Sequence, residues 1–158
     1  MVRHQSLTRS TPLGLAKCPR TVSILQHSHQ IHLLGNFSTE AYCLYKQNKL
    51  NKALESLKVQ ERNSETMLLE SQILFCMGKM GACVDVYQKL LKSKIDSLEI
   101  NHVAGLVLGG RASEVLGMME ANRIKASSSF ELAYNTACSL IERNKYIEAE
   151  QILLTARR

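Results

Sequence analysis

The stretch LYKQNKLNKALESL, residues 44–57, carries a leucine, then a turn residue, a small residue and a large apolar residue four, nine and thirteen places further on. The same order recurs from three more leucines, at intervals of 30, 32 and 34 residues. The four sets are Leu44, Asn48, Ala53 and Leu57; Leu74, Gly78, Cys83 and Tyr87; Leu106, Gly110, Val115 and Met119; and Leu140, Asn144, Ala149 and Leu153. Recurring offsets of this kind predict an internal repeat.

Each unit reads as two amphipathic helices joined by a tight turn. Apolar residues at i, i+3, i+4 and i+7 share one face of a helix, and both arms of each unit show that spacing. Asn and Gly adopt the left-handed conformation that commonly ends a helix, which suits the four turn positions. A unit of about 34 residues in this order is typical of the tetratricopeptide repeat. We therefore expect an all-α fold, a tetratricopeptide-repeat α-solenoid of about four helical hairpins.

Local signals refine this expectation. Four glycines (Gly105, Gly109, Gly110 and Gly117) lower helix propensity and make the third unit the weakest. Ser128 and Glu131 have capping-box spacing ahead of a helix expected over 132–143. The last helix carries Ile147, Ile152, Leu153 and Leu154 with no following repeat to cover them, so we expect self-association.

Composition divides the chain into two parts. Both prolines, Pro12 and Pro19, lie in the first twenty residues, and residues 1–39 hold four basic side chains and no acidic one. We expect a disordered basic leader over 1–37 and the repeat array over 38–158, truncated at its C-terminal end. No run of 18 apolar residues occurs, so no membrane span is expected. Five cysteines without a C-x-x-C pair indicate reduced thiols and no zinc site.

The leader leaves alternatives open. Its lack of acidic residues and its arginines partly match an organellar transit peptide, and a disordered arm is the simpler interpretation. An RNA-binding module that uses this basic segment is a further hypothesis. His27, His29 and His32 lack nearby cysteines or carboxylates, so we expect no metal there.

Three stretches carry a family resemblance: AYCLYKQNKL (residues 41–50), MGKMGACVDVY (77–87) and ELAYNTACSLI (131–141). In this order they resemble the seventy-two-kilodalton subunit of the eukaryotic signal recognition particle, and their residues are most similar to those of the plant members. The resemblance covers about residues 41–158, in the N-terminal repeat region of that family. It does not extend upstream of about residue 40.

The resemblance implies a cytoplasmic ribonucleoprotein that targets ribosomes making secretory proteins to the endoplasmic reticulum. In that family the repeats hold the companion sixty-eight-kilodalton subunit. A basic region further along the family's chain contacts the particle's 7S RNA, and it has no counterpart here, so RNA is expected only through the assembled particle. A generic tetratricopeptide-repeat adaptor and an imported organellar repeat protein are the alternative functions.

A partner is expected to bind along the first helix of each hairpin. The register places there an apolar groove with aromatic anchors, suited to a partner helix or extended segment. The candidate partner-binding residues are Tyr42, Tyr45, Lys46, Gln72, Phe75, Tyr134, Cys138 and Ile141, and Ile100, Ala104 and Val107 continue the groove in the third unit. Packing inside the hairpins is the alternative role for Tyr42, Phe75 and Tyr134. Lys46 and Asn135 alone hint at a clamp for a C-terminal carboxylate.

No catalytic constellation emerges from the sequence. His102 is the one histidine within the repeats, where such a residue is ordinarily structural or solvated. Gly109-Gly110 lacks the following Lys-Ser/Thr of a phosphate loop. The sequence therefore predicts a protein that is not an enzyme, with no cofactor.

Overall fold

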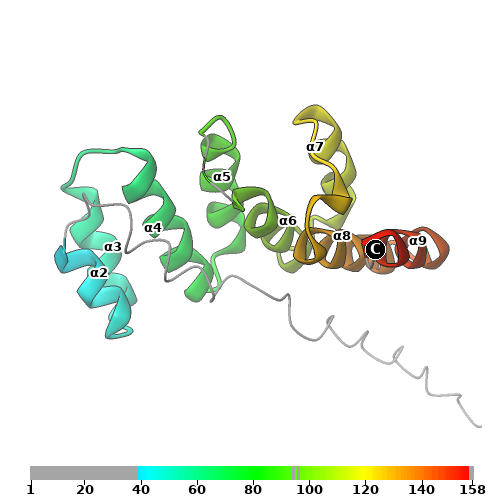
Figure 1. Ribbon diagram of the computed structural model, residues 1–158. Coiled ribbons are helices and arrows are strands. Elements are labelled where there is room, and N and C mark those ends of the chain that lie inside the picture. Colours follow the sequence, from blue (N-terminus) through cyan, green and yellow to red (C-terminus); the bar gives the residue numbers. More distant parts are fainter. Residues whose placement is uncertain (1–38, 94, 96, 157–158) are drawn as a thin grey trace, which may run out of the picture.

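The computed structural model describes residues 39–93, 95 and 97–156. The expectations for the leader over 1–37 lie outside these residues. All regular secondary structure in the described part of the chain is helical (Figure 1). Its elements are α2 (Thr39–Lys46), α3 (Leu50–Lys58), α4 (Ser64–Cys76), α5 (Met80–Leu90), α6 (Leu98–Leu108), η1 (Ala112–Glu114), α7 (Val115–Ala121), η2 (Ala126–Ser128), α8 (Phe130–Glu142) and α9 (Tyr146–Ala156).

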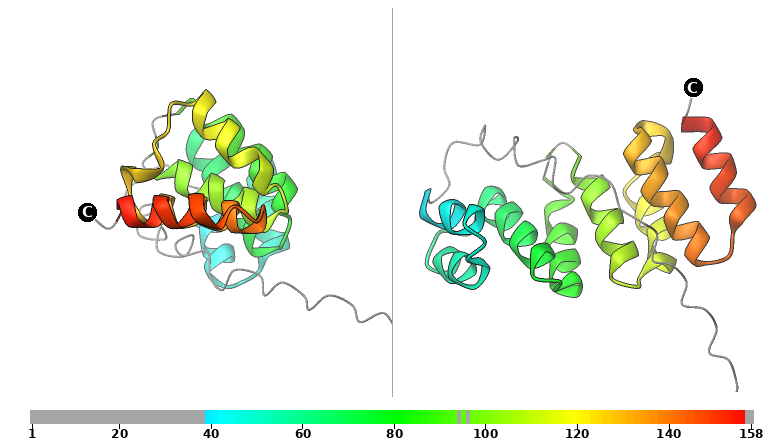
Figure 2. Two further views of the ribbon diagram at one scale, coloured as in Figure 1. Left: turned by 90° about the vertical axis from the view of Figure 1, so that its right-hand side faces the viewer. Right: turned by 90° about the horizontal axis from the view of Figure 1, so that it is seen from below.

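Consecutive helices pack as hairpins, which stand side by side in one elongated row (Figures 1 and 2). The pairs are α2 with α3, α4 with α5, α6 with η1 and α7, and α8 with α9. The predicted all-α helical-repeat solenoid is confirmed. The third unit is irregular, because its second arm begins as the 3₁₀ segment η1 and continues as the short helix α7. The glycines around this arm explain the irregularity, since they weaken the α-helix there.

The repeat positions occupy equivalent places. The small residues Ala53, Cys83, Val115 and Ala149 are all between 0% and 2% exposed. Leu74, Leu106 and Leu140 are 6%, 2% and 1% exposed. Leu44, in the first hairpin, is half-buried and packs on the cluster formed by α2, α3 and α4. The small residue of each repeat is therefore fully buried, as expected of a position where two helices pack together.

All four predicted turn residues are left-handed. Asn48, Gly78, Gly110 and Asn144 have φ of 58°, 72°, 72° and 61°. In each repeat the N–H of the following residue donates to the carbonyl of the repeat leucine: Lys49 to Leu44, Lys79 to Leu74, Arg111 to Leu106 and Lys145 to Leu140, at 2.8–2.9 Å. This six-to-one bond defines the Schellman motif, which satisfies carbonyls that the helix end leaves open. The repeated leucine thus packs the core with its side chain and closes the turn with its backbone.

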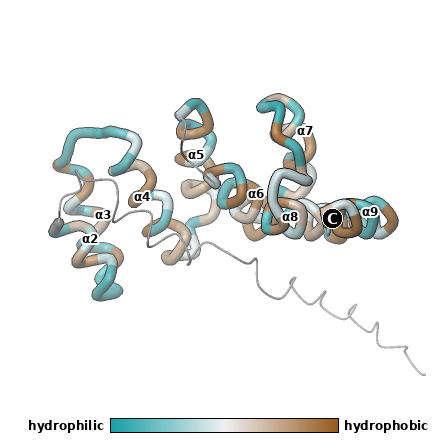
Figure 3. Tube along the Cα trace, in the orientation of Figure 1, coloured by the Kyte–Doolittle hydropathy of each residue, from teal (hydrophilic) through white to brown (hydrophobic). Residues whose placement is uncertain are grey.

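Apolar clusters join one hairpin to the next. One cluster contains side chains from α5, α6, α7 and α8, with Val84, Val103, Leu106 and Val115 among its members. A second cluster joins α4, α5 and α6, and a third joins α2, α3 and α4. Figure 3 shows polar and apolar residues alternating along most of the helices. Each hairpin is therefore linked to its neighbour by apolar packing, as expected of a stacked array.

The helix caps correct one prediction and add one feature. Ser129, not Ser128, caps α8, because its side chain accepts a hydrogen bond from the Leu132 N–H at 3.1 Å. Ser128 instead ends η2. A reciprocal capping box is present at α4, between Asn63 and Thr66.

No helix in the described ranges is both long enough and apolar enough to cross a bilayer.

Candidate protein-binding surface on the first helices

All eight predicted partner-binding residues lie on the first helices of the hairpins. Tyr42, Tyr45, Phe75, Tyr134 and Ile141 are half-buried, and Lys46 is exposed. Gln72 and Cys138 are each 2% exposed, so neither offers contact area in this arrangement. The third-unit positions Ile100, Ala104 and Val107 are buried as well, at 6%, 0% and 3%. The accessible part of the predicted groove therefore lies at α2, at the end of α4 and at α8.

Three of the predicted residues form a patch on α2. The rings of Tyr42 and Tyr45 lie 6.3 Å apart at 43°, and the Lys46 amine lies 5.9 Å from the centre of the Tyr42 ring. Burial, together with neighbouring Cys76 on α4, raises the pKa of Tyr45 to about 12. The Tyr45 hydroxyl thus stays protonated at neutral pH. This patch combines aromatic surface with one cation, a composition suited to binding polypeptide.

The middle of the predicted groove is formed by α4. Gln72 lies in the interior, and its side-chain oxygen accepts no hydrogen bond. A buried carbonyl oxygen without a donor is unfavourable, and at 2% exposure the Gln72 side chain is closed to a ligand. Phe75, three residues on, is half-buried and packs against the cluster of Leu68, Leu74 and Leu98. Phe75 therefore packs within the core and still leaves part of its side chain accessible to a partner.

The other patch lies on α8. Phe130 and Tyr134 stack with their ring centres 6.5 Å apart and their planes 27° from parallel. Phe130 is 58% exposed, whereas Tyr134 packs against the core cluster that also contains Cys138. Ile141 belongs to a separate cluster with Leu140 and Ala149. The structure thus brings Tyr134 together with Cys138 but not with Ile141.

Two surface residues near these patches were missed by sequence reasoning. Cys76 is exposed and interacts with Tyr45, and Phe130 extends the Tyr134 patch. Phe130 lies four residues before Tyr134, a spacing that places both on one helix face and was available from the sequence. The contact between Cys76 and Tyr45 joins two repeats, so no local pattern contains it. Asn135, proposed for a carboxylate clamp, is 0% exposed and donates to the Ile100 carbonyl at 3.3 Å, so it holds α8 to α6.

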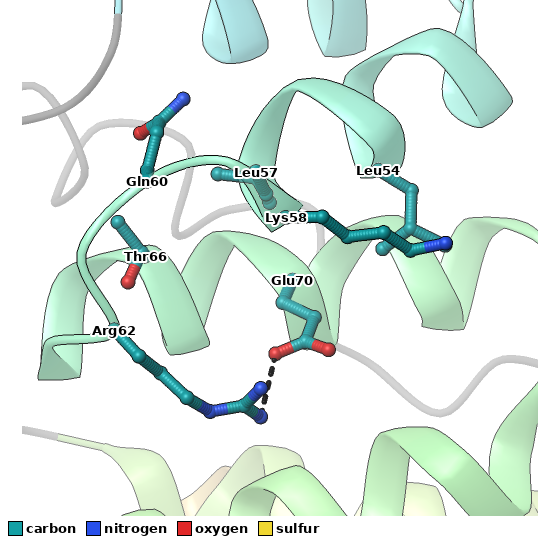
Figure 4. Close-up of a pocket in the computed structure, with 7 residues that line it drawn as sticks. All are labelled: Leu54, Leu57, Lys58, Gln60, Arg62, Thr66 and Glu70. Carbon is teal, nitrogen blue, oxygen red and sulfur yellow. Dashed lines mark hydrogen bonds and ion pairs between the residues drawn. The ribbon is translucent and has the colours of Figure 1, made fainter.

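Three surface hollows lie elsewhere on the array, and none is lined by the eight predicted residues. Figure 4 shows one of about 180 Å³ between α3 and α4, with Leu54 and Leu57 on one side and the ion pair of Arg62 with Glu70 on the other. The Arg62 Nη2 and Glu70 Oε2 atoms are 3.0 Å apart. Another hollow, of about 440 Å³, contains His102 on α6 and the ion-paired Arg111 and Glu114.

Two buried titratable side chains, His102 and Tyr87, have strongly shifted pKa values. His102 is 0% exposed, and burial followed by the nearby Arg111 charge lowers its pKa to about 4. It is therefore neutral at physiological pH. Its ring lies 6.3 Å from that of Tyr87, whose own pKa burial raises. Within the described ranges, no three residues among His, Cys, Asp and Glu are grouped so as to hold a metal ion.

Comparison with known proteins gives one consistent relationship. No protein-family model matches the chain. Over 123 residues, 75% of its length, the chain is 29% identical to signal recognition particle subunit SRP72 of Dictyostelium discoideum. It is 27% identical over 126 residues to the human subunit of that name and 26% identical to the dog subunit. The matched region spans 18% of the length of these relatives. The chain is therefore similar to one segment of a much longer protein.

Proposed function

We propose that this SRP72-like chain is a protein-binding scaffold of the signal recognition particle. The observation that carries the proposal is the ordered similarity to three SRP72 proteins over about three quarters of the chain. The helical-repeat architecture supports it, because stacked hairpins present an extended surface to another polypeptide. In this role the array contributes binding area and shape and performs no chemistry.

The partner in this proposal is the companion sixty-eight-kilodalton subunit of the particle. The surface offered to it runs over the first helices, from the Tyr42 and Tyr45 patch past Phe75 to Tyr134. Half-buried aromatic side chains are well suited to this task, since they are already held by packing and lose little conformational freedom on binding. A helix or extended segment laid along the row would contact these side chains in turn.

Binding to this partner would also place the chain in the signal recognition particle. By binding the companion subunit, the chain would join a cytoplasmic ribonucleoprotein that directs ribosomes to the endoplasmic reticulum during secretory protein synthesis. Its relation to the particle RNA would be indirect and would pass through the assembled particle. Two ion pairs on the described repeats, Lys145 with Glu148 and Arg62 with Glu70, support this view, because each neutralises a basic side chain that could otherwise contact phosphate.

Binding to the purified companion subunit tests the proposal. The chain is titrated against the labelled subunit, alongside Phe75→Ala and Tyr134→Ala. We expect each variant to bind at least about tenfold more weakly, the loss associated with a buried aromatic anchor at an interface. Lys52→Ala and Glu55→Ala, exposed positions on the second helix α3, are matched controls and should bind like the unmodified chain.

Two outcomes would reject the proposal. The first is absence of binding by the unmodified chain at tens of micromolar, which leaves a generic repeat adaptor as the better description. The second is equal loss of binding in the α3 controls and the aromatic variants. Because Phe75 and Tyr134 also pack in the core, circular dichroism and a thermal transition must show that both variants remain folded.

A further inference from the structure

The hollow of about 440 Å³ beside His102 lies where the second repeat meets the third. Residues of α5, α6, η1 and α7 form it, and its volume is in the range of small-ligand pockets. Three of its lining residues are buried: Val84, His102 and Leu106. The others include charged and polar side chains that reach solvent: Asp85, Gln88, Arg111, Glu114 and Asn122. The hollow therefore has a buried base and a polar rim.

The His102 position is polar in every repeat, and only in the third repeat does it lack a partner. It lies four places before the repeat leucine. The equivalents are partnered: Glu40 with the Ser56 hydroxyl at 3.4 Å, Glu70 with Arg62 at 3.0 Å, and Thr136 with the Leu132 carbonyl at 2.7 Å. His102 is 0% exposed, and neither of its ring nitrogens has a hydrogen-bond partner among the described residues. Because an unpaired buried polar atom is unfavourable, this position lacks a group that a ligand could supply.

The hollow gives a ligand a route to the His102 ring. Gln72 also has an unpartnered buried oxygen, but it lines none of the three hollows described above. Arg111 lies close to His102, because its charge acts on the His102 pKa. Its Nε and Nη2 atoms donate to Glu114 at 2.7 and 2.8 Å, whereas its Nη1 atom is 3.7 Å from the Asp85 carboxylate. A ligand can therefore displace Arg111 from Asp85 while the stronger pair with Glu114 remains.

The charges of the lining favour a cation. The hollow is lined by two carboxylates and one guanidinium, which leaves one negative charge in excess, and His102 is neutral at physiological pH. The Asp85 side chain is 70% exposed and only loosely paired, so it keeps room to accept hydrogen bonds. An anion would face both carboxylates. A ligand that donates hydrogen bonds and carries positive charge matches this lining.

We propose that this hollow binds the ammonium group of a lysine side chain from another polypeptide. An ammonium has three N–H donors, and three acceptors line the hollow: the Asp85 carboxylate, one His102 ring nitrogen and the Gln88 side-chain oxygen. The His102 proton then resides on the other ring nitrogen. The methylene stem of the lysine packs along Leu106 and Met118. A guanidinium fits less well, because its planar fork needs paired acceptors and Glu114 is already taken by Arg111.

Nuclear magnetic resonance of the full chain with a small lysine analogue tests the proposal. The probe is Nα-acetyl-lysine N-methylamide, added at constant ionic strength. A single side chain binds weakly, so we expect saturable shifts with a dissociation constant of about 1–10 mM. The shifts should be confined to backbone amides around the hollow and to the His102 ring nitrogens. Nα-acetyl-norleucine N-methylamide has a similar apolar stem and no ammonium, and it should bind at least about tenfold more weakly.

Two variants of the hollow and one control separate this site from general charge effects. Asp85→Asn removes the carboxylate, and His102→Phe keeps a ring but removes both nitrogens. Each should weaken lysine-analogue binding at least about tenfold. Glu120→Gln removes the same charge as Asp85→Asn from an exposed residue of α7 that does not line the hollow, so binding should be unchanged. Circular dichroism and a thermal transition must show that all three variants are folded.

Four results would overturn the inference: no saturable shift, equal binding of the norleucine analogue, unchanged binding in His102→Phe, or an equal loss in Glu120→Gln and Asp85→Asn. Binding to the companion subunit is measured separately. Asp85 lies outside the first helices, so Asp85→Asn should bind that subunit like the unmodified chain. Failure of this inference is therefore distinguishable from failure of the proposed function.

Discussion

The backbone N–H of Lys145 donates to the Leu140 carbonyl at 2.9 Å, and Lys49 makes the same bond to Leu44 at 2.9 Å in the first repeat. Each bond requires the residue just before the donor, Asn144 or Asn48, to be left-handed. In the two middle repeats the left-handed residue is Gly78 or Gly110. The turns are thus chemically equivalent although their residues differ, because Asn tolerates positive φ at small cost and Gly at none.

Gly78→Ala should destabilise the array by about 1 kcal/mol, the cost of forcing a Cβ-bearing residue into the left-handed region. Space is not the reason, since a methyl group at this position would meet nothing within 4 Å. Urea unfolding followed by circular dichroism measures the change. Gly117→Ala is the control: it also has open space but no positive φ, so it should stabilise α7 by roughly 0.5–1 kcal/mol. A loss of stability in both variants would contradict the assignment.

Asn63→Ala should remove the capping box of α4 and cost about 1 kcal/mol. The Asn63 side-chain oxygen accepts from the Glu65 and Thr66 N–H groups at 3.0 and 2.9 Å, and the Thr66 hydroxyl oxygen accepts from the Asn63 N–H at 3.0 Å. Lys79 occupies the corresponding position ahead of α5 and makes no side-chain capping bond. Lys79→Ala should therefore leave the urea midpoint unchanged, and an equal effect of both substitutions would argue against side-chain capping.

Acidification should destabilise the fold through His102. Its pKa of about 4 in the folded state lies below the ordinary 6.5, so below pH 6.5 the unfolded chain binds a proton that the folded chain does not. Stability is therefore complete above about pH 6.5 and declines as the pH falls toward 4. The loss between pH 8 and pH 5 should be roughly 2 kcal/mol, from about 1.4 kcal/mol per unit of pKa shift.

His102→Gln isolates this contribution, because glutamine does not titrate. The two proteins are compared by urea unfolding at pH 8 and pH 5, and their difference in pH dependence belongs to His102. The flanking Arg111 and Glu114 remain in both proteins, and their opposite charges act on the His102 pKa in opposite directions. Identical pH profiles would show that the pKa of His102 is the same in the folded and the unfolded chain.

Native alkylation should separate the cysteines by burial. Cys43 and Cys76 are exposed, whereas Cys83 and Cys138 are buried. Burial raises the pKa of Cys83 to about 12, and its thiol donates to the Ser71 carbonyl at 3.2 Å, so it supplies almost no reactive thiolate. Peptide mass spectrometry after brief iodoacetamide treatment at pH 8 should find Cys43 and Cys76 modified. Cys83 and Cys138 should react only in denaturant, and their early modification would show an opening of the α4–α5 or α8 core.

Local sequence chemistry accounts for the repeat itself. The offsets from Leu44, Leu74, Leu106 and Leu140 predict the helices, their turns and the buried small residues, because helix periodicity and left-handed turn propensity act within a few residues. The same locality explains the misplaced cap of α8. Ser128 and Ser129 are both good N-cap residues, and the choice between them depends on how η2 packs against α8 and α9.

Tertiary structure alone decided which predicted groove residues remain accessible. Gln72 and Tyr42 share a register position, yet Gln72 is 2% exposed and Tyr42 is half-buried. Sequence register determined which side of a helix each residue occupies. How deeply a side chain is covered depends on contacts between hairpins tens of residues apart, and that information exists only once the hairpins have stacked.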